Sequence, residues 1–242
     1  MKKCFSKTQS GISTRSDLKS NVSNLTSFQI KAAAKITGLI LILFSSIAFG
    51  QSPKYQEAMQ KGLSAFEAAK TPDEYLASAD SFDAIAQTEV RNWLPFYYSA
   101  YSNLKAGLLS ADNLLKDVYF NKALQQIHKA DPLSANNSEI FSLKAYIQFM
   151  MMTVDPQSRR LFYEDYLDSL EKAKALDPNN PRPYLIEGQS TFYTPEAFGG
   201  GKKMARPFLA TAVEKFAKFK PETDLSPIWG AAQAQKLLGQ CE

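Results

Sequence analysis

A single histidine, His128, limits the chemistry available to this chain of 242 residues. Nucleophilic triads and most zinc sites need a histidine. His128 follows Ile127, an inward position of a predicted helix, so we expect its ring on the solvated flank of that helix. Carboxylates alone would suit zinc poorly. We therefore expect no catalytic residue, no metal site and no cofactor, and we predict that the protein is not an enzyme.

Four acidic residues, Glu164, Asp165, Asp168 and Glu171, form a second candidate site. All except Asp165 share one face of a predicted helix, where paired carboxylates could perform acid–base chemistry or hold calcium. Two lysines follow closely, and mixed charges are usual on the solvent-exposed face of a helix. We interpret the patch as such a face.

The run Gly199-Gly200-Gly201-Lys202-Lys203 contains the residue types of a phosphate-binding loop without its spacing. That loop needs a preceding strand and a hydroxyl for magnesium. Here a predicted helix precedes the glycines, and Met204 stands in the place of the hydroxyl. We expect a turn into a helix that begins near Lys202. An anion resting on that helix start stays an alternative.

Three consecutive methionines, Met150 to Met152, follow Phe149 and could suggest a site for a soft metal. Consecutive residues of a helix point about 100° apart. The three sulfur atoms therefore cannot converge on one ion, and we interpret the run as packing in a core or groove.

The first 50 residues have the composition of a secretory leader. A basic region precedes an apolar run from Ile36 to Ala48, and small residues lead to a cleavage site between Gly50 and Gln51. A membrane anchor is the alternative, but roughly 13 apolar residues fall short of the ~20 that span a bilayer. The long basic region also leaves open a later start codon or a retained segment. We expect an exported domain, 51–242, without a stable membrane span after cleavage.

The charge of the expected mature chain differs from that of the whole sequence. Residues 51–242 hold 21 Lys/Arg and 23 Asp/Glu, although the whole chain has a net charge of +4. The excess of basic residues therefore belongs to the leader, and we expect no nucleic-acid partner. Cys241 is the one cysteine left after cleavage. It could pair between chains or stay an inert thiol near the terminus.

The domain shows helical periodicity throughout and no run of alternating β-branched residues. Thr71 to Glu74 form a capping box, and Asp155, Asn180 and Ser226 each precede a proline at an expected helix start. Ser110 and Asn137 can cap two more helices. The expected helices cover residues 53–70, 73–88, 92–109, 113–130, 138–153, 157–175, 181–193, 202–218 and 227–239. The sequence thus predicts an all-α protein.

An internal repeat organises these helices in pairs. Apolar residues recur in the second helices at Phe82, Ile127, Leu170 and Val213, spaced 45, 43 and 43. Aromatic residues recur in the first helices at Phe96, Phe141, Tyr184 and Trp229, spaced 45, 43 and 45. Small residues follow four positions after the first three aromatics, at Ala100, Ala145 and Gly188. Each small residue shares a helix face with its aromatic, so it lets the paired helices approach closely.

The pattern around residues 172–188 resembles the tetratricopeptide repeat, in which helix hairpins stack to share one core. The stretch Ala173 to Asn180 ends one helix, and Tyr184, Ile186 and Gly188 follow in the next. The likeness is close over residues 123–188 and weaker elsewhere, because the period of 43–45 exceeds the usual 34. It implies a right-handed α-solenoid of about four hairpins with a C-terminal capping helix.

The resemblance also implies a binding surface, since the first helices of stacked hairpins line the concave side. The residues expected to face that groove are Tyr97, Tyr101, Tyr146, Arg182 and Gln189. Tyrosine offers contact area at low entropic cost and a hydroxyl that gives direction. The alternative is that some of these tyrosines complete the core.

Three functions remain open from the sequence. The first is an exported, non-enzymatic scaffold that binds a protein or peptide of the cell envelope in its concave groove. The second is a small-ligand binding protein that assists an envelope transporter, which a deep pocket lined by Tyr and Arg would favour. The third is an enzyme that uses carboxylates on the stack.

Overall fold

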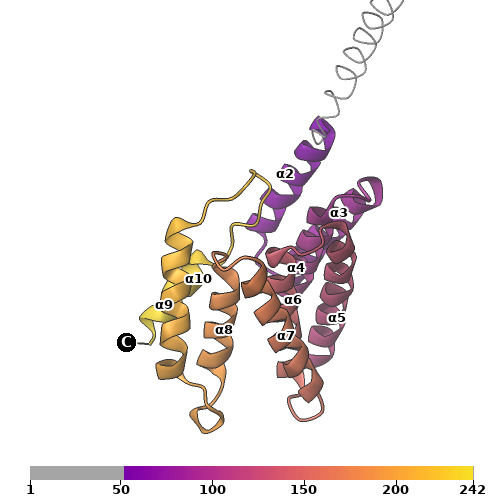
Figure 1. The fold of residues 1–242 in the computed structure, drawn as a ribbon. Helices are drawn as coiled ribbons and strands as arrows, with labels where there is room; N and C mark the ends of the chain where they lie inside the picture. Colours follow the sequence, from indigo (N-terminus) through magenta and orange to yellow (C-terminus); the bar gives the residue numbers. More distant parts are fainter. Residues whose placement is uncertain (1–51, 242) are drawn as a thin grey trace, which may run out of the picture. The chain divides into compact units, whose positions relative to one another are not determined.

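The computed structural model describes residues 52–241, which form a stack of α-helices within one unit of the chain (Figure 1). The predicted leader and its cleavage site lie outside these residues. In residues 52–241 the helices are α2 Pro53–Ala68, α3 Pro72–Thr88, α4 Trp93–Leu109, α5 Asn113–Ala130, α6 Ser138–Val154, α7 Arg160–Leu176, α8 Arg182–Tyr193, α9 Lys202–Lys218 and α10 Ala231–Gly239. No strand occurs in this part of the chain, which confirms the all-α prediction.

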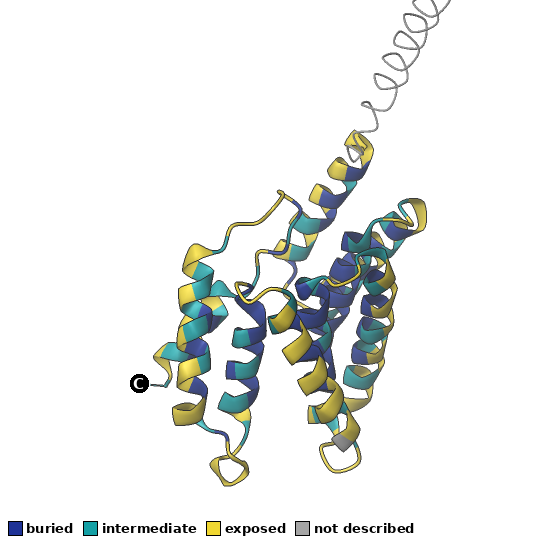
Figure 2. Cartoon of the chain, viewed as in Figure 1, coloured by how far each residue is buried: buried dark blue, intermediate teal, exposed yellow. Residues whose placement is uncertain are grey.

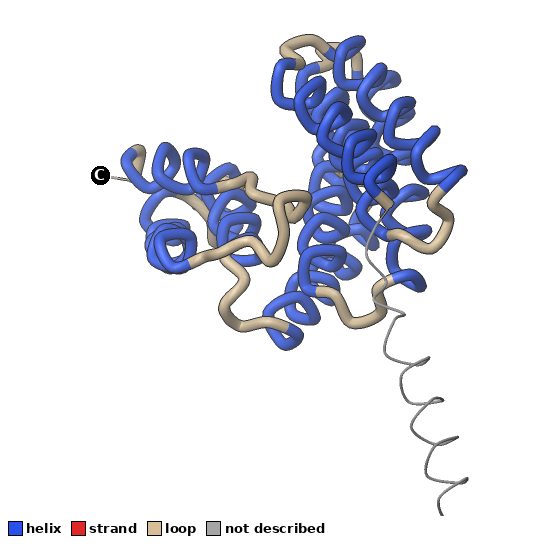
Figure 3. The backbone as a smooth tube through the Cα atoms, turned by 90° about the horizontal axis from the view of Figure 1, so that it is seen from above, coloured by secondary structure: helices blue, strands red, loops and turns tan. Residues whose placement is uncertain are grey.

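Successive helices pack as four hairpins, α2–α3, α4–α5, α6–α7 and α8–α9, and α10 packs on the last of them. Figure 3, seen from above, shows helices packed side by side and joined by loops. The buried faces turn toward the inside of this stack (Figure 2). The sequence pattern therefore predicted the hairpins and the capping helix, with most bounds within three residues.

Side-chain caps fix the starts of α3 and α6 as the sequence predicted, but the expected cap Asp155 was wrong, because α7 begins at Arg160. Thr71 and Glu74 form a reciprocal capping box at α3, and Asn137 accepts a hydrogen bond from the backbone of Glu139 at α6. At α5 the cap is Asp112, which accepts from the backbone of Leu114, so the prediction of Ser110 was wrong. An aspartate at this position also offsets the positive end of the helix dipole.

Small residues permit the close helix contacts, as the repeat predicted. Ala100 and Ala145 are fully buried in the larger core, which extends from α2 to α8. Gly188 is buried between α8 and α9, and a Cβ atom added there would lie 2.7 Å from the Leu209 side chain. A second, smaller core joins α8, α9 and α10 around Leu185 and Leu209.

The predicted start of the last helix was wrong. Helix α10 begins at Ala231 rather than at residue 227, and residues 219–230 run without regular helix between α9 and α10. Gly230 has φ of +113°, a left-handed conformation that glycine adopts without strain. Trp229 therefore does not belong to the first helix of another hairpin. It lies in a non-helical segment, Leu225–Trp229, which begins in a turn and which we call the C-terminal strap.

None of the helices in residues 52–241 combines the length and the apolar character required to span a bilayer.

Replacing Gly188 with leucine tests the close approach of α8 and α9. The added side chain would meet both the side chain of Leu209 and its backbone nitrogen, which lies 3.1 Å from the new Cβ position. We expect a loss of about 1–3 kcal/mol in the free energy of unfolding by overpacking, measured by thermal and urea denaturation. Gly239→Ala is the matched control, because nothing lies within 4 Å of a Cβ added at Gly239. Equal stability of Gly188→Leu and wild type would contradict the packing.

Candidate functional site

The C-terminal strap lies on the concave surface where the sequence predicted an open groove. The structure brings the five predicted groove residues to this surface, but it buries all of them. Their exposed fractions are 0% for Tyr97, 7% for Tyr101, 4% for Tyr146, 0% for Arg182 and 8% for Gln189. The groove is therefore closed by the chain itself, and a binding role for these residues stays a prediction.

Trp229 is the main contact between the strap and the stack. Its ring stacks on Tyr101 with a centroid distance of 4.9 Å and on Tyr146 with a centroid distance of 6.2 Å. Its indole Nε1 donates a hydrogen bond of 2.8 Å to the hydroxyl of Tyr97. Flat aromatic pairs add about 0.5–1.5 kcal/mol each beyond the area that they bury. The indole thus fills the place that a partner would need in an open groove.

Hydrogen bonds fix both ends of the strap. The hydroxyl of Tyr98 donates to the carbonyl of Leu225 over 2.8 Å, at the beginning of the strap. Beyond its end, Gln233 donates to Gln189 over 2.6 Å, and Gln189 donates to the hydroxyl of Tyr146 over 3.1 Å. These contacts join residues far apart in the sequence. The sequence does not reveal these contacts, because Ser226-Pro227 has the pattern of a helix start.

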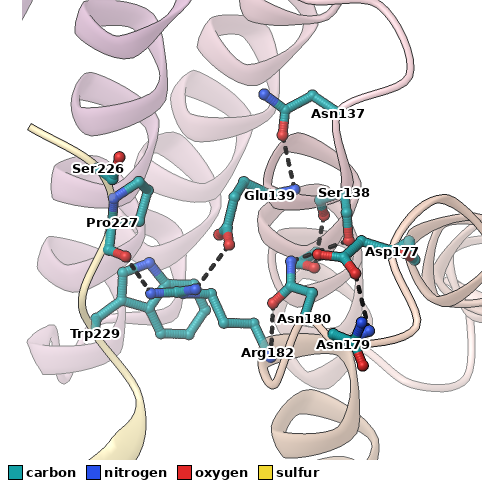
Figure 4. A network of polar contacts seen from close by, with 12 residues as sticks. Asn137, Ser138, Glu139, Asp177, Asn179, Asn180, Arg182, Ser226, Pro227 and Trp229 are labelled. Carbon is teal, nitrogen blue, oxygen red and sulfur yellow. Dashed lines mark hydrogen bonds and ion pairs between the residues drawn. The ribbon is translucent and has the colours of Figure 1, made fainter. Parts of the chain in front are cut away.

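Arg182 connects the strap to helix α6 (Figure 4). Its guanidinium donates to Glu139 Oε1 over 2.7 Å and to the carbonyl of Pro227. The same group lies over the rings of Phe219, at 4.8 Å, and Trp229, at 5.1 Å. A buried guanidinium needs such partners, because a buried charge without them is costly. Arg182 therefore ties the strap and the α6 end into one network.

Burial also changes the acidity of Glu139. Loss of solvent raises the pKa of Glu139 to about 7, although the charge of Arg182 offsets part of the rise. A hydrogen-bonded network on the neighbouring turn holds the start of α6. There Asn180 donates to Ser138 Oγ over 3.0 Å and accepts from the backbone of Arg182 (Figure 4). Glu139 is thus a partly buried group whose raised pKa lies near neutral pH.

A cleft of about 760 Å³ opens beside this network. Its wall is formed by the α5–α6 turn and the start of α6, the α7–α8 turn, the end of α9 and the segment that follows it. Glu139, Asn180 and Pro227 line the cleft, so it borders the Arg182 network directly. This volume lies within the range of about 300–1,000 Å³ typical of small-molecule sites.

Positive charges and aromatic rings both line the cleft. Lys215, Lys218 and Lys220 come from the end of α9 and the residues after it, and Trp93 and Phe219 supply rings. Carboxylates from Asp177, Glu214 and Glu222 also reach the lining, and Lys218 pairs with Glu214 over 2.6 Å. The cleft can therefore contact a flat ring and anionic groups of the same ligand.

The histidine, the acidic patch and the methionine run that the sequence singled out do not come together in one site. His128 is exposed on α5. In the acidic patch, Glu171 forms an ion pair with Lys174 over 2.9 Å, as expected for mixed charges on an exposed helix face. Within residues 52–241, no group of three or more His, Cys, Asp or Glu is placed to hold a metal ion. Met151 is buried in the core, as the packing interpretation predicted.

The glycine run forms the turn that the sequence predicted, and α9 begins at Lys202. Gly199 and Gly201 have φ of +82° and +95°, where glycine is favoured.

Comparison with solved structures finds a protein of similar fold. HusA, a haemophore from Porphyromonas gingivalis, superposes with a TM-score of 0.70 and shares 32% sequence identity. The match covers 80% of this chain and 95% of HusA. The chain belongs to the same family as HusA. Neither a protein-family model nor a curated protein sequence matches the chain. Its likeness to tetratricopeptide repeats therefore stays a resemblance.

The raised pKa of Glu139 predicts how stability depends on pH. A carboxyl whose pKa rises on folding stabilises the folded state fully below its unfolded pKa, about 4.3, and loses that contribution as the pH rises through about 7. We therefore expect the free energy of unfolding to fall between pH 5 and pH 8, measured by urea denaturation. In Glu139→Gln this dependence should flatten. The control is Glu171→Gln, whose side chain is 69% exposed, and an unchanged slope in Glu139→Gln would contradict the assignment.

Proposed function

We propose that this protein is an exported carrier of a haem-class tetrapyrrole, held in the cleft beside Glu139 and Pro227. The kinship with the haemophore HusA, at 32% identity over 95% of that chain, carries this proposal. It corresponds to the small-ligand alternative from the sequence and makes the ligand class specific. Delivery to an envelope transporter is part of the same proposal.

The chemistry of the cleft supports a tetrapyrrole. Such a ligand combines a broad flat ring with two carboxylate side groups. The rings of Trp93 and Phe219 can contact the flat face, and the amines of Lys218 and Lys220 can pair with the carboxylates. Charge-assisted pairs of this kind are stronger than neutral hydrogen bonds. The cleft therefore offers a partner for both parts of the ligand.

The lining of the cleft also predicts that no side chain of the cleft coordinates the iron of a bound haem. Protein ligands of haem iron are His, Cys, Met or Tyr, and none of these is among the described residues that line the cleft. Binding should therefore depend on the ring and its carboxylates.

We expect haem and iron-free protoporphyrin IX to bind with dissociation constants within about tenfold of each other. Absorbance and fluorescence titrations of the mature chain measure both. A ligand held through iron would instead leave protoporphyrin IX without measurable binding, and this result would contradict the assignment to the cleft.

The lysines at the end of α9 test the position of the ligand. The double variant Lys218→Glu/Lys220→Glu should weaken haem binding about tenfold or more, since two attractive contacts become repulsive. Lys54→Glu/Lys61→Glu is the matched control, because it makes the same change of charge at exposed positions of α2, outside the cleft. Equal affinity of the two variants would place the ligand elsewhere. Absence of haem binding by the wild-type chain would refute the proposed function itself.

The protein- or peptide-binding role has less support, because the strap closes the predicted groove over residues such as Tyr101 and Tyr146. No further observation on that surface favours such a partner.

A further inference from the structure

Exposed apolar side chains gather on three turns of the stack. Of the twelve large hydrophobic side chains exposed in residues 52–241, nine belong to the α4–α5, α6–α7 and α8–α9 turns or to the helix ends beside them. The most exposed are Phe198 at 81%, Leu114 at 77% and Leu161 at 74%. Two others lie elsewhere, Val90 on the α3–α4 turn at the opposite end and Ile228 in the C-terminal strap. The distribution is strongly uneven between the two ends.

The three turns lie side by side, and we call them the turn edge. An ion pair between Asp117 and Arg159 joins the start of α5 to the α6–α7 turn. A hydrogen bond of 2.6 Å between Tyr166 and Ser190 joins the start of α7 to the end of α8. Figure 1 shows the α6–α7 and α8–α9 turns at the same end, and Figure 2 shows exposed residues there. The turns can therefore meet one extended surface together.

Positive charges accompany the apolar side chains on the α8–α9 turn. Lys202, Lys203 and Arg206 are exposed at the start of α9, beside Phe198 and Met204. The first turn of α9 contains no acidic residue, although the dipole of a helix favours acids at that end and disfavours lysines. Glu196 of the preceding turn lies against Gly201 at this helix start and supplies a carboxylate there, and the three cations stay exposed around it.

Three acidic groups of the turn edge are engaged locally. Asp112 caps α5, Asp117 pairs with Arg159, and Asp155 accepts from Ser158. In the described part of the chain, no ion pair involves Lys202, Lys203 or Arg206. Glu164 and Asp165 near the start of α7 and Glu196 on the α8–α9 turn are exposed as well. The turn edge thus offers unpaired positive charge next to apolar tips.

We propose that the turn edge docks on an anionic lipid surface, with Phe198, Met204 and the tips of the other turns entering the interfacial layer. Separate apolar tips with nearby lysines suit a lipid interface, which accepts dispersed side chains while cations contact the headgroups. Tyr163 and Tyr193 add aromatic rings that favour the same layer. The contact is peripheral, because none of the described helices is suited to span a bilayer.

This orientation leaves the proposed ligand site accessible. The cleft lies between the α5–α6 turn, the α7–α8 turn and the end of α9, which is the end of the stack opposite the turn edge. A docked molecule would hold the cleft away from the membrane. The docking goes beyond the proposed function and does not depend on it.

Vesicle co-sedimentation of the chain 51–242 tests the proposal. Vesicles would consist of phosphatidylcholine alone or of an equal mixture with phosphatidylglycerol, at low ionic strength. We expect binding to the mixed vesicles, weakened by added salt, and much weaker binding to phosphatidylcholine alone. Lys202→Glu/Lys203→Glu should lower the partition coefficient at least about tenfold, given about fivefold for each cation near an anionic surface.

A second pair of variants tests the apolar contact. Phe198→Ser/Met204→Ser should lower the partition coefficient about tenfold or more, since two large side chains leave the interfacial layer. Val90→Ser/Ile228→Ser is the matched control outside the turn edge, where the side chains are 61% and 64% exposed. Circular dichroism checks the fold of every variant. Absence of wild-type binding to the mixed vesicles, or an equal loss in the control, would overturn the proposal, and haem affinity unchanged in the turn-edge variants would show that the two functions are separate.

Discussion

The contacts of the buried Arg182 guanidinium hold the C-terminal strap on the concave surface of this domain. The guanidinium joins Glu139 of α6, the carbonyl of Pro227 and the ring of Trp229 within one network. Because a buried charge must keep its partners, the strap cannot leave the concave surface without exposing or stranding Arg182. The strap is therefore a structural element, and Trp229 completes the interior of the stack.

Closure of the concave surface moves the accessible chemistry to the two ends of the hairpins. At one end, the turns that follow the second helices form a cleft with lysines, carboxylates and rings. At the other end, the turns within the hairpins expose apolar tips such as Leu114 and Phe198. A stack of hairpins produces this division naturally, because all turns of one kind lie at the same end. Ligand and membrane contacts can thus be placed apart on one small domain.

The kinship with HusA gives the cleft a chemical context. A fold shared over 95% of that chain, at 32% identity, indicates common descent. Fold alone would not specify a ligand, so the class of ligand is inferred from the residues that line the cleft. Glu139 is of interest there, because its pKa of about 7 couples the charge state of the cleft wall to Arg182 and the strap.

The sequence by itself determined the helices and their pairing. Spacing of about 45 residues, small residues such as Gly188 and caps such as Thr71 act locally or between neighbouring helices, so their signals are readable along the chain. Tertiary structure alone decided that Trp229 fills the groove. Its contacts with Tyr97 and Tyr101 span more than a hundred residues, and its local pattern resembled the column of first-helix aromatics. The cleft also came from tertiary structure, since it is assembled from separate turns that no single periodicity relates.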